Sequence, residues 1–262
     1  MGIEFRHHPG LIAYLTIGDP DLVTSKKIAL AAIDAGADVI ELGVPFSDPL
    51  ADGPVIQRAS ERAVRNGTRL LDVLALAREL HAERPTAGLV IFSYLNPILR
   101  MGLEAFADAA ERAGVDAVLV TDLIPEESTE YRAILRKHHL QPIFLVAPTS
   151  PDKRLQHIAE VSEGFVYAIS RVGITGTQQQ VAGDARGLVA RLRRFTSLPI
   201  ALGFGISNAA HVAAVAEYAD AAVVGSAIVA LIEQSGAEQA PAAVAAYIAG
   251  LRTPAEAESV VS

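Results

Sequence analysis

The chain has 262 residues, a length that suits one large domain or two small ones, and its 51% apolar content predicts a substantial core rather than disorder. Lys and Arg number 22 against 30 Asp and Glu, a net charge of −8, so no nucleic acid and no membrane is expected as a partner. The sequence has no cysteine, which excludes disulfides, thiolate catalysis and cysteine-ligated metals.

Short apolar runs rich in Val and Ile alternate with amphipathic stretches along the chain. Near-continuous apolarity, rather than alternation, is typical of parallel strands that are covered on both faces. The predicted strands are Leu11–Thr16, Val39–Gly43, Leu89–Tyr94, Ala117–Thr121, Ile143–Ala147, Phe165–Ile169, Ile200–Gly203 and Ala222–Gly225. Helical patterns between them include residues 22–37, 69–83, 103–115 and 187–195.

Eight strands that alternate with helices predict an α/β fold, a single-domain TIM (β/α)8 barrel. A doubly wound open sheet is the alternative, but polar and Gly-rich residues follow nearly every run, which favours the barrel. No Pro, Gly or Ser-rich linker divides the chain, so we expect one domain over residues 1–262, with a frayed polar tail from about Thr253.

Targeting signals are weak in this sequence. The most uniformly apolar run, Ala221 to Ile232, is too short to cross a bilayer. Asp19, Pro20 and Asp21 follow the first apolar run without a small-residue cleavage site, so a signal peptide is not expected. The expected location is the cytoplasm.

Residues 41–54, ELGVPFSDPLADGP, carry three carboxylates around the end of the second strand. Glu41 shares a strand face with Val39, so it points into the barrel mouth if Val39 lines the barrel. Burial there would raise its pKa and suit a group that gives and takes a proton, whereas Asp52 on a polar loop should ionise more easily. The alternative is that Glu41 pairs with a cation while Asp48 and Asp52 cap turns.

Glycine-rich sequences follow the last two predicted strands, GFGIS at 203–207 and GSAIV at 225–229. Barrels commonly bind phosphate at these two positions through backbone N–H groups, and Ser226 would add a hydroxyl donor. Ordinary turn chemistry is the alternative. Residues 171–184 are polar and read as a lid over the substrate, or else as a connection without a role. The seven histidines show no metal-binding spacing, so no metal is expected.

Five segments together resemble the alpha chain family of tryptophan synthase. They are YLTIGDPD at 14–21, ELGVPFSDPLADGPVIQRA at 41–59, SRVGITG at 170–176, LGFGIS at 202–207 and VVGSAIV at 223–229. Their order and spacing match over essentially the whole barrel, and the run at 41–54 is the most specific.

The resemblance implies a retro-aldol cleavage of indole-3-glycerol phosphate to indole and glyceraldehyde 3-phosphate, with no cofactor. It places Glu41 as the general acid/base and Asp52 as the carboxylate at the indole nitrogen. It also assigns other positions: Gly176, Gly205, Gly225 and Ser226 to the phosphate, Tyr14, Phe92, Tyr94, Leu119, Tyr167 and Phe204 to the indole pocket, and Thr175 to the lid.

In this family indole passes to a pyridoxal-phosphate beta chain, so an alpha2beta2 complex is expected, with residues 45–56 on the contact side. Two features differ from the family pattern. The segment before the first strand leaves no room for an N-terminal helix, and the lid sequence TGTQQQVAG is unusual. The alternatives are a stand-alone lyase, a sugar-phosphate epimerase or isomerase, and a chiefly regulatory subunit.

Overall fold

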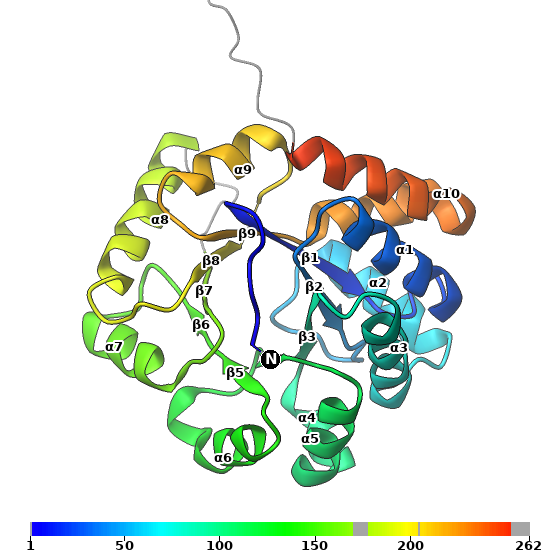
Figure 1. Ribbon diagram of the computed structural model, residues 1–262, viewed down its shortest axis with the longest axis horizontal. Helices are drawn as coiled ribbons and strands as arrows, with labels where there is room; N and C mark the ends of the chain where they lie inside the picture. The colour runs from blue at the N-terminus through cyan, green and yellow to red at the C-terminus, as the bar shows by residue number, and fades with distance from the viewer. Residues whose placement is uncertain (1, 170–177, 204, 253–262) are drawn as a thin grey trace, which may run out of the picture.

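The computed structural model describes residues 2–169, 178–203 and 205–252, and shows a barrel of parallel strands surrounded by helices (Figure 1). The strands are β1 Gly10–Thr16, β2 Val39–Gly43, β3 Gly88–Ser93, β4 Ala117–Val120, β5 Gln141–Ile143, β6 Leu145–Val146, β7 Val166–Ile169, β8 Ile200–Gly203 and β9 Ala221–Val224. Each predicted strand overlaps an observed one, and the ends agree within two residues. The predicted TIM barrel is therefore confirmed.

Closure of the barrel depends on the segment that contains β5 and β6. The strand order is β5-β4-β3-β2-β1-β9-β8-β7-β6, so the two ends of this order are consecutive in the chain. β5 pairs with β4, and β6 pairs with β7, with Phe144 between them. The two pieces act as one fifth barrel strand, which excludes the open sheet.

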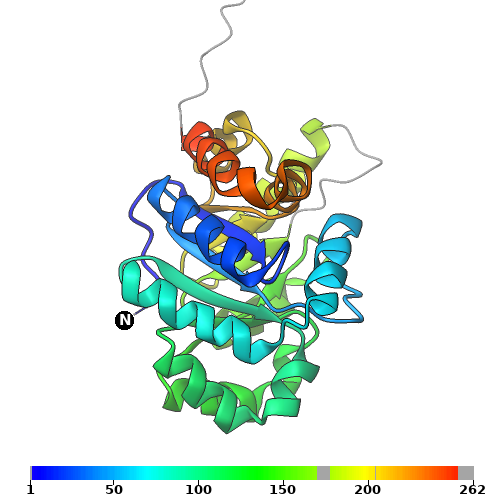
Figure 2. The same cartoon turned by 90° about the vertical axis from the view of Figure 1, so that its right-hand side faces the viewer.

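The helices cover the outside of the barrel. They are α1 Leu22–Asp34, α2 Pro54–Arg65, α3 Leu70–Glu83, α4 Leu95–Met101, α5 Leu103–Arg112, α6 Thr129–Lys137, α7 Asp152–Val161, α8 Gln178–Leu192, α9 Ala209–Ala216 and α10 Ser226–Arg252, with a 3-10 turn η1 at Pro125–Glu127. α10 (orange to red) bends at Gly236 and packs beside α1 (blue), as Figure 2 shows. In the described part of the chain, no helix is long and apolar enough to span a membrane.

The predicted lid at 171–184 needs a correction. Residues from Gln178 onward belong to α8, so the second half of that segment is helical rather than a polar loop. Its three glutamines and Ala182 are compatible with a helix, a pattern that the polar composition concealed. Residues 170–177, with Thr175 and Gly176, lie outside the described residues.

Two apolar layers hold the barrel together. Inward side chains such as Ile12, Val39, Val90 and Phe165 fill its interior. Outward side chains of the same strands pack beneath the helices in a second, larger cluster. Since both faces are buried, the strands are apolar without alternation, as the sequence indicated.

An aspartate at the base of the barrel recurs just before β2, β4 and β9. Each carboxylate accepts a hydrogen bond from a backbone N–H near the start of the neighbouring strand. The pairs are Asp38 with Leu11 at 2.8 Å, Asp116 with Leu89 at 3.0 Å and Asp220 with Ile200 at 2.6 Å. These bonds satisfy amides that the parallel ladder leaves open at its lower edge.

The short N-terminal lead closes the floor of the barrel without a helix. Ile3 and Phe5 pack against the lowest interior residues, and the Phe5 and Phe165 rings lie 6.1 Å apart. Arg252 at the end of α10 fixes this segment, because it donates to the Pro9 carbonyl at 2.7 Å and to Asp38 at 2.5 Å. Side chains of the segment before β1 therefore cover the base of the barrel, where the sequence left no room for an N-terminal helix.

Candidate active site

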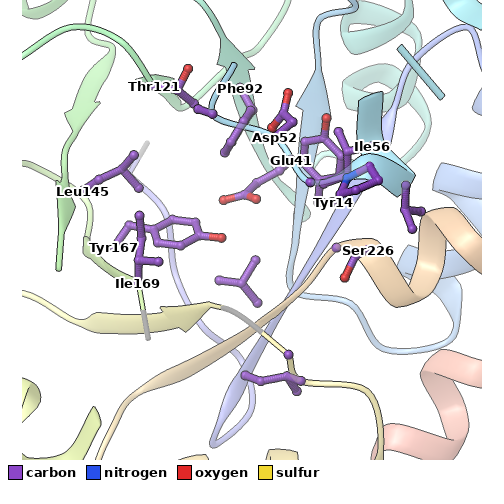
Figure 3. A pocket seen from close by; sticks show the side chains of 18 residues that line it. Tyr14, Glu41, Asp52, Ile56, Phe92, Thr121, Leu145, Tyr167, Ile169 and Ser226 are labelled. Carbon is purple, nitrogen blue, oxygen red and sulfur yellow. The ribbon is translucent and has the colours of Figure 1, made fainter. Parts of the chain in front are cut away.

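A cavity of about 410 Å³ opens at the carboxyl ends of the strands, where TIM barrels carry their active sites (Figure 3). Its walls are mostly apolar, with Glu41, Asp52 and Ser226 among the polar exceptions. The remaining lining residues are Tyr14, Ala51, Gly53, Pro54, Val55, Ile56, Phe92, Thr121, Leu145, Tyr167, Ile169, Gly205, Ile206, Val223 and Gly225. An apolar chamber with a few convergent polar groups is typical of a small-molecule site.

Glu41 projects into the centre of this cavity from β2. Val39, two residues earlier on the same strand face, belongs to the barrel interior, which places the Glu41 side chain inside the mouth as expected. The residue is 0% exposed, and neither carboxyl oxygen has a hydrogen-bond partner in the structure. Burial raises the pKa of Glu41 to about 8, so the carboxyl holds a proton at neutral pH. The alternative of a cation partner is not met by any described residue.

Asp52 lies on the loop between β2 and α2, at the edge of the same cavity. Burial raises the pKa of Asp52 to about 6, and a hydrogen bond from the Tyr94 hydroxyl partly opposes that rise. The polar loop sequence did not indicate this burial, although Asp52 still ionises more easily than Glu41. At neutral pH the site therefore pairs a protonated Glu41 with an ionised Asp52.

The loop from Pro45 to Gly53 is held by side chains on both sides. Ser60 on α2 accepts from the Phe46 N–H at 2.8 Å and donates to the Phe46 carbonyl at 2.9 Å. Gln57 donates to the Asp52 carbonyl at 2.8 Å. On the other side, the Phe46 and Tyr94 rings lie 5.2 Å apart. These contacts set the position of Asp52 without using its carboxylate.

Of the residues expected in an indole pocket, Tyr14, Phe92 and Tyr167 line the cavity. Tyr94 lies behind the wall, where its hydroxyl reaches Asp52 at 3.1 Å. Leu119 is buried in the interior layer below, and it pairs in register with Phe92. Phe204 lies outside the described residues.

A glycine-rich part of the cavity wall follows β8 and β9. Gly205 follows β8 and has a φ of +71°, a conformation that L side chains rarely adopt. Gly225 precedes α10, and Ser226 is the first residue of that helix. Both glycines and Ser226 line the cavity, so open amide groups at a helix N-terminus face it. Such a group of N–H donors suits an anion such as phosphate.

Several lining residues were not predicted. Leu145, Ile169 and Val223 each lie two residues beyond an interior position, so the period of two could have revealed them. Thr121 likewise follows Leu119 by two residues and lines the cavity above it. Ile56 comes from the first turn of α2, and nothing in the local sequence indicates that it faces the cavity.

The described residues contain no group of three or more His, Asp or Glu side chains that could hold a metal ion. The donor set of the site is therefore two carboxyl groups, phenols, hydroxyls and backbone amides. These groups suit proton transfer and anion binding.

Comparison with known proteins identifies the family of this chain. The family model "Tryptophan synthase alpha chain" matches residues 3–256. The tryptophan synthase alpha chain of Burkholderia pseudomallei (strain K96243) is 47% identical over 243 residues, covering 93% of this chain and 90% of the relative. That of Thiobacillus denitrificans is 44% identical over 257 residues, covering 98% and 94%.

A solved tryptophan synthase complex from Pyrococcus furiosus contains a chain with the same fold. The TM-score is 0.85 at 36% identity, over 93% of this chain and 98% of that one. With its fold, the two carboxyl groups of its cavity and these relatives, the chain belongs to the tryptophan synthase alpha chain family.

Proposed function

We propose that this chain cleaves indole-3-glycerol phosphate into indole and glyceraldehyde 3-phosphate, as a carbon–carbon lyase of tryptophan biosynthesis. The observation that carries the proposal is Glu41, a fully buried carboxyl with no partner in an apolar cavity that Asp52 also lines. Burying such a group without a hydrogen bond costs about 1–3 kcal/mol. A catalytic need for a mobile proton accounts for this cost.

The reaction needs one proton moved in each direction. Glu41 delivers its proton to C3 of the indole ring, which prepares the bond between C3 and the side chain to break. The electrons of that bond return to the ring and give indole. Glu41 then takes the proton from the side-chain hydroxyl, whose carbon becomes the aldehyde of glyceraldehyde 3-phosphate. The raised pKa of Glu41 suits both steps, because the carboxyl is neutral at the start and, after its proton leaves, is a stronger base than an exposed carboxylate.

Asp52 acts on the other end of the indole ring. Protonation at C3 leaves positive charge on the ring nitrogen, and an ionised carboxylate near its N–H stabilises that charge. Tyr14, Phe92 and Tyr167 supply apolar surface for the ring. Gly205, Gly225 and Ser226 are proposed to bind the phosphate through amide and hydroxyl donors, with Gly176 as a further phosphate residue and Thr175 as the lid residue. No metal or organic cofactor is needed for these steps.

The test is indole release by the purified chain from indole-3-glycerol phosphate. Glu41→Gln keeps the shape of the side chain but removes the proton carrier, so turnover should fall by roughly 10²–10⁴-fold. An exposed change on α10, Glu238→Gln, is the matched control and should leave the rate unchanged. Turnover of Glu41→Gln close to that of the wild type would exclude this mechanism.

We also propose a tryptophan synthase beta chain as the partner, in an alpha2beta2 complex. Leu50 is 92% exposed on the loop between β2 and α2 that carries Asp52, and the exposed Pro54 follows it. Phe46 and Pro49 are half-buried beside it, whereas Pro45, the first residue of the segment expected on the contact side, is buried. An exposed leucine on an apolar, proline-rich edge is typical of a protein contact.

A beta chain on this edge would order the loop that carries Asp52 and so raise the rate of indole formation. Titration of a beta chain into the indole assay, with calorimetry to follow association, measures both effects. Association without a rate change would remove this role of the loop. The cytoplasmic location expected from the sequence remains a prediction.

A further inference from the structure

Tyr14 lies beside Glu41 on the neighbouring strand. β1 and β2 pair in parallel with Tyr14 opposite Glu41, so both side chains point into the barrel mouth. Tyr14 is 6% exposed, and its ring meets the Phe92 ring edge-on, with centroids 5.1 Å apart and planes at 77°. The ring is therefore held in place on its apolar sides.

The Tyr14 hydroxyl extends beyond Glu41 toward Asp52. It lies over Gly43, where a Cβ atom would overlap it, and Gly43 is two residues after Glu41 on the same strand face. Along β2, the direction from Glu41 to Gly43 leads toward the cavity mouth. Figure 3 shows the Tyr14 hydroxyl on the Asp52 side of the cavity. Gly43 is thus required because the far end of the Tyr14 ring, together with its hydroxyl, occupies this space.

The hydrogen bonds of this hydroxyl are incomplete. Among the described residues, its hydrogen-bond partner is the Thr16 hydroxyl at 3.5 Å, the long limit of such a bond, so the phenol has no short acceptor there. A buried phenol with an unused donor is costly, and phenylalanine would fill the apolar space without that cost. An acceptor for this proton is therefore expected in the working site.

We propose that the Tyr14 hydroxyl is a second hydrogen-bond donor to the Asp52 carboxylate, acting with Tyr94 as a positioning residue during turnover. The inference rests on the lyase function proposed above. Two phenols would then hold the carboxylate, one from β1 and one from the segment after β3. With both donors in place, Asp52 keeps its charge directed at the indole nitrogen as positive charge develops there.

The charges around Tyr14 agree with this role. Burial is the largest cause that raises the pKa of the Tyr14 phenol, and the nearby Asp52 and Glu41 carboxyls raise it further. The phenol therefore stays protonated, and able to donate, throughout the working pH range. The described titratable groups that face this corner are Glu41 on β2, Tyr94 after β3 and Tyr167 on β7. Glu41, the other carboxyl, is protonated near neutral pH and so leaves Asp52 as the charged acceptor.

The first experiment compares Tyr14→Phe with the wild type in steady-state indole release across pH. A donor to the ionised form lowers the pKa of Asp52, so removing it moves the acid limb of kcat/KM upward by about half to one pH unit. We expect kcat to fall by about 3–10-fold, and KM to change by less than about twofold. Tyr131→Phe is the control, because Tyr131 is also buried but donates to the Val118 carbonyl, away from the cavity.

The second experiment identifies the acceptor with a double-mutant cycle. If Tyr14 acts through Asp52, adding Tyr14→Phe to Asp52→Asn changes the residual rate by less than about twofold. An undiminished effect in that background would assign the donor to the substrate or to Glu41 and overturn the proposal. Equal pH profiles and rates for Tyr14→Phe and wild type would also overturn it.

A third readout does not need turnover. Carbon-13 NMR of labelled Asp52 measures its pKa directly, and Tyr14→Phe should raise it while Tyr131→Phe does not. An inactive wild-type chain with this NMR shift present would count against the lyase function alone. An active wild type without the shift would count against the Tyr14 assignment alone.

Discussion

The hydroxyl of Tyr94 donates to Oδ2 of Asp52 at 3.1 Å and accepts from the Ala51 N–H at 2.9 Å. One phenol therefore positions both the carboxylate and the backbone of the loop between β2 and α2. The Phe46 ring packs against the same phenol, 5.2 Å from centroid to centroid. Tyr94 thus contributes to the site through Asp52 rather than as a wall of the cavity.

Tyr94→Phe should lower kcat by about tenfold, because a hydrogen bond to a charged group contributes about 1.5–3 kcal/mol. The Ala51 N–H also loses its acceptor, so the loop should become more sensitive to protease. Steady-state assays and limited proteolysis of the variant check the two effects. Tyr131→Phe serves as the control, and an unchanged kcat would show that Tyr94 only fills space.

The wild-type pH profile should be bell-shaped. In the proposed mechanism, activity needs an ionised Asp52, whose pKa is raised to about 6, and a protonated Glu41, whose pKa is raised to about 8. kcat/KM of the free enzyme should therefore fall below about pH 6 and above about pH 8. In Asp52→Asn the acid limb should disappear while the alkaline limb stays. A single limb in the wild type would contradict this division of roles.

Glu41→Gln should be more stable than wild type at alkaline pH. In the unfolded chain Glu41 ionises near pH 4.5, but in the fold its pKa is raised to about 8. The folded state therefore binds a proton that the unfolded state lacks, and stability falls as the pH rises through this interval. The advantage of the variant should grow from near zero at pH 4 to about 2–4 kcal/mol at pH 9.

Urea unfolding of Glu41→Gln and wild type across this pH range measures that difference in the free energy of unfolding. Glu238→Gln, an exposed change on α10, should show the same dependence of the free energy of unfolding on pH as wild type. A constant difference at every pH would mean that Glu41 is not held neutral by burial.

Gly225→Asp should weaken binding of the phosphorylated substrate. A Cβ at Gly225 would lie 3.4 Å from the Tyr14 Cβ, so the side chain fits with little adjustment, but its charge would oppose the phosphate. KM should rise by at least about tenfold, since an anion replaces helix N-terminal attraction with repulsion. Gly205→Asp is less informative, because the φ of +71° at Gly205 adds backbone strain.

A dephosphorylated substrate analogue is the control for this variant. Its binding to Gly225→Asp should change by less than about twofold, whereas an equal loss for both ligands would place the phosphate elsewhere. Calorimetry with each ligand gives the comparison directly.

Leu50→Asp should weaken association with a beta chain. The side chain is 92% exposed, so the fold should tolerate the change, but a buried charge at an interface centre costs affinity. The beta-chain concentration for half-maximal stimulation should rise by about tenfold or more. Leu71→Asp on α3, where the leucine is 63% exposed, is the control. Equal behaviour of the two variants would remove the loop from the interface.

Much of the fold could be predicted because it follows from local pattern. Continuous apolar runs marked the strands, and the position of Glu41 followed from Val39 and the period of two. The break at Phe144 could not be predicted, since it depends on how β5 and β6 reach different neighbours. The beginning of α8 at Gln178 was also missed, because its polar glutamines resemble a loop.

In the site, too, local sequence pattern predicted some features, whereas tertiary contacts decided others. Asp52 was found by its sequence context, but its burial was not, because that burial depends on contacts with distant segments. Tyr94, 42 residues away in the chain, supplies its hydrogen bond, and Ile56 enters the cavity only because α2 packs against the barrel. Tertiary contacts of this kind leave no periodic trace in the sequence.

The packing of Ile3 and Phe5 beneath the barrel has a consequence for how small molecules enter and leave the cavity. Among the described residues, the barrel interior below the cavity is packed with apolar side chains, and the cavity itself lies at the carboxyl ends of the strands, beside the loop that carries Asp52. In the proposed reaction, substrate and products would therefore enter and leave the cavity at this end of the barrel rather than through its base. A partner protein bound at this end of the barrel would therefore control the order in which the two products leave. Indole would then reach that partner before it reaches the solvent.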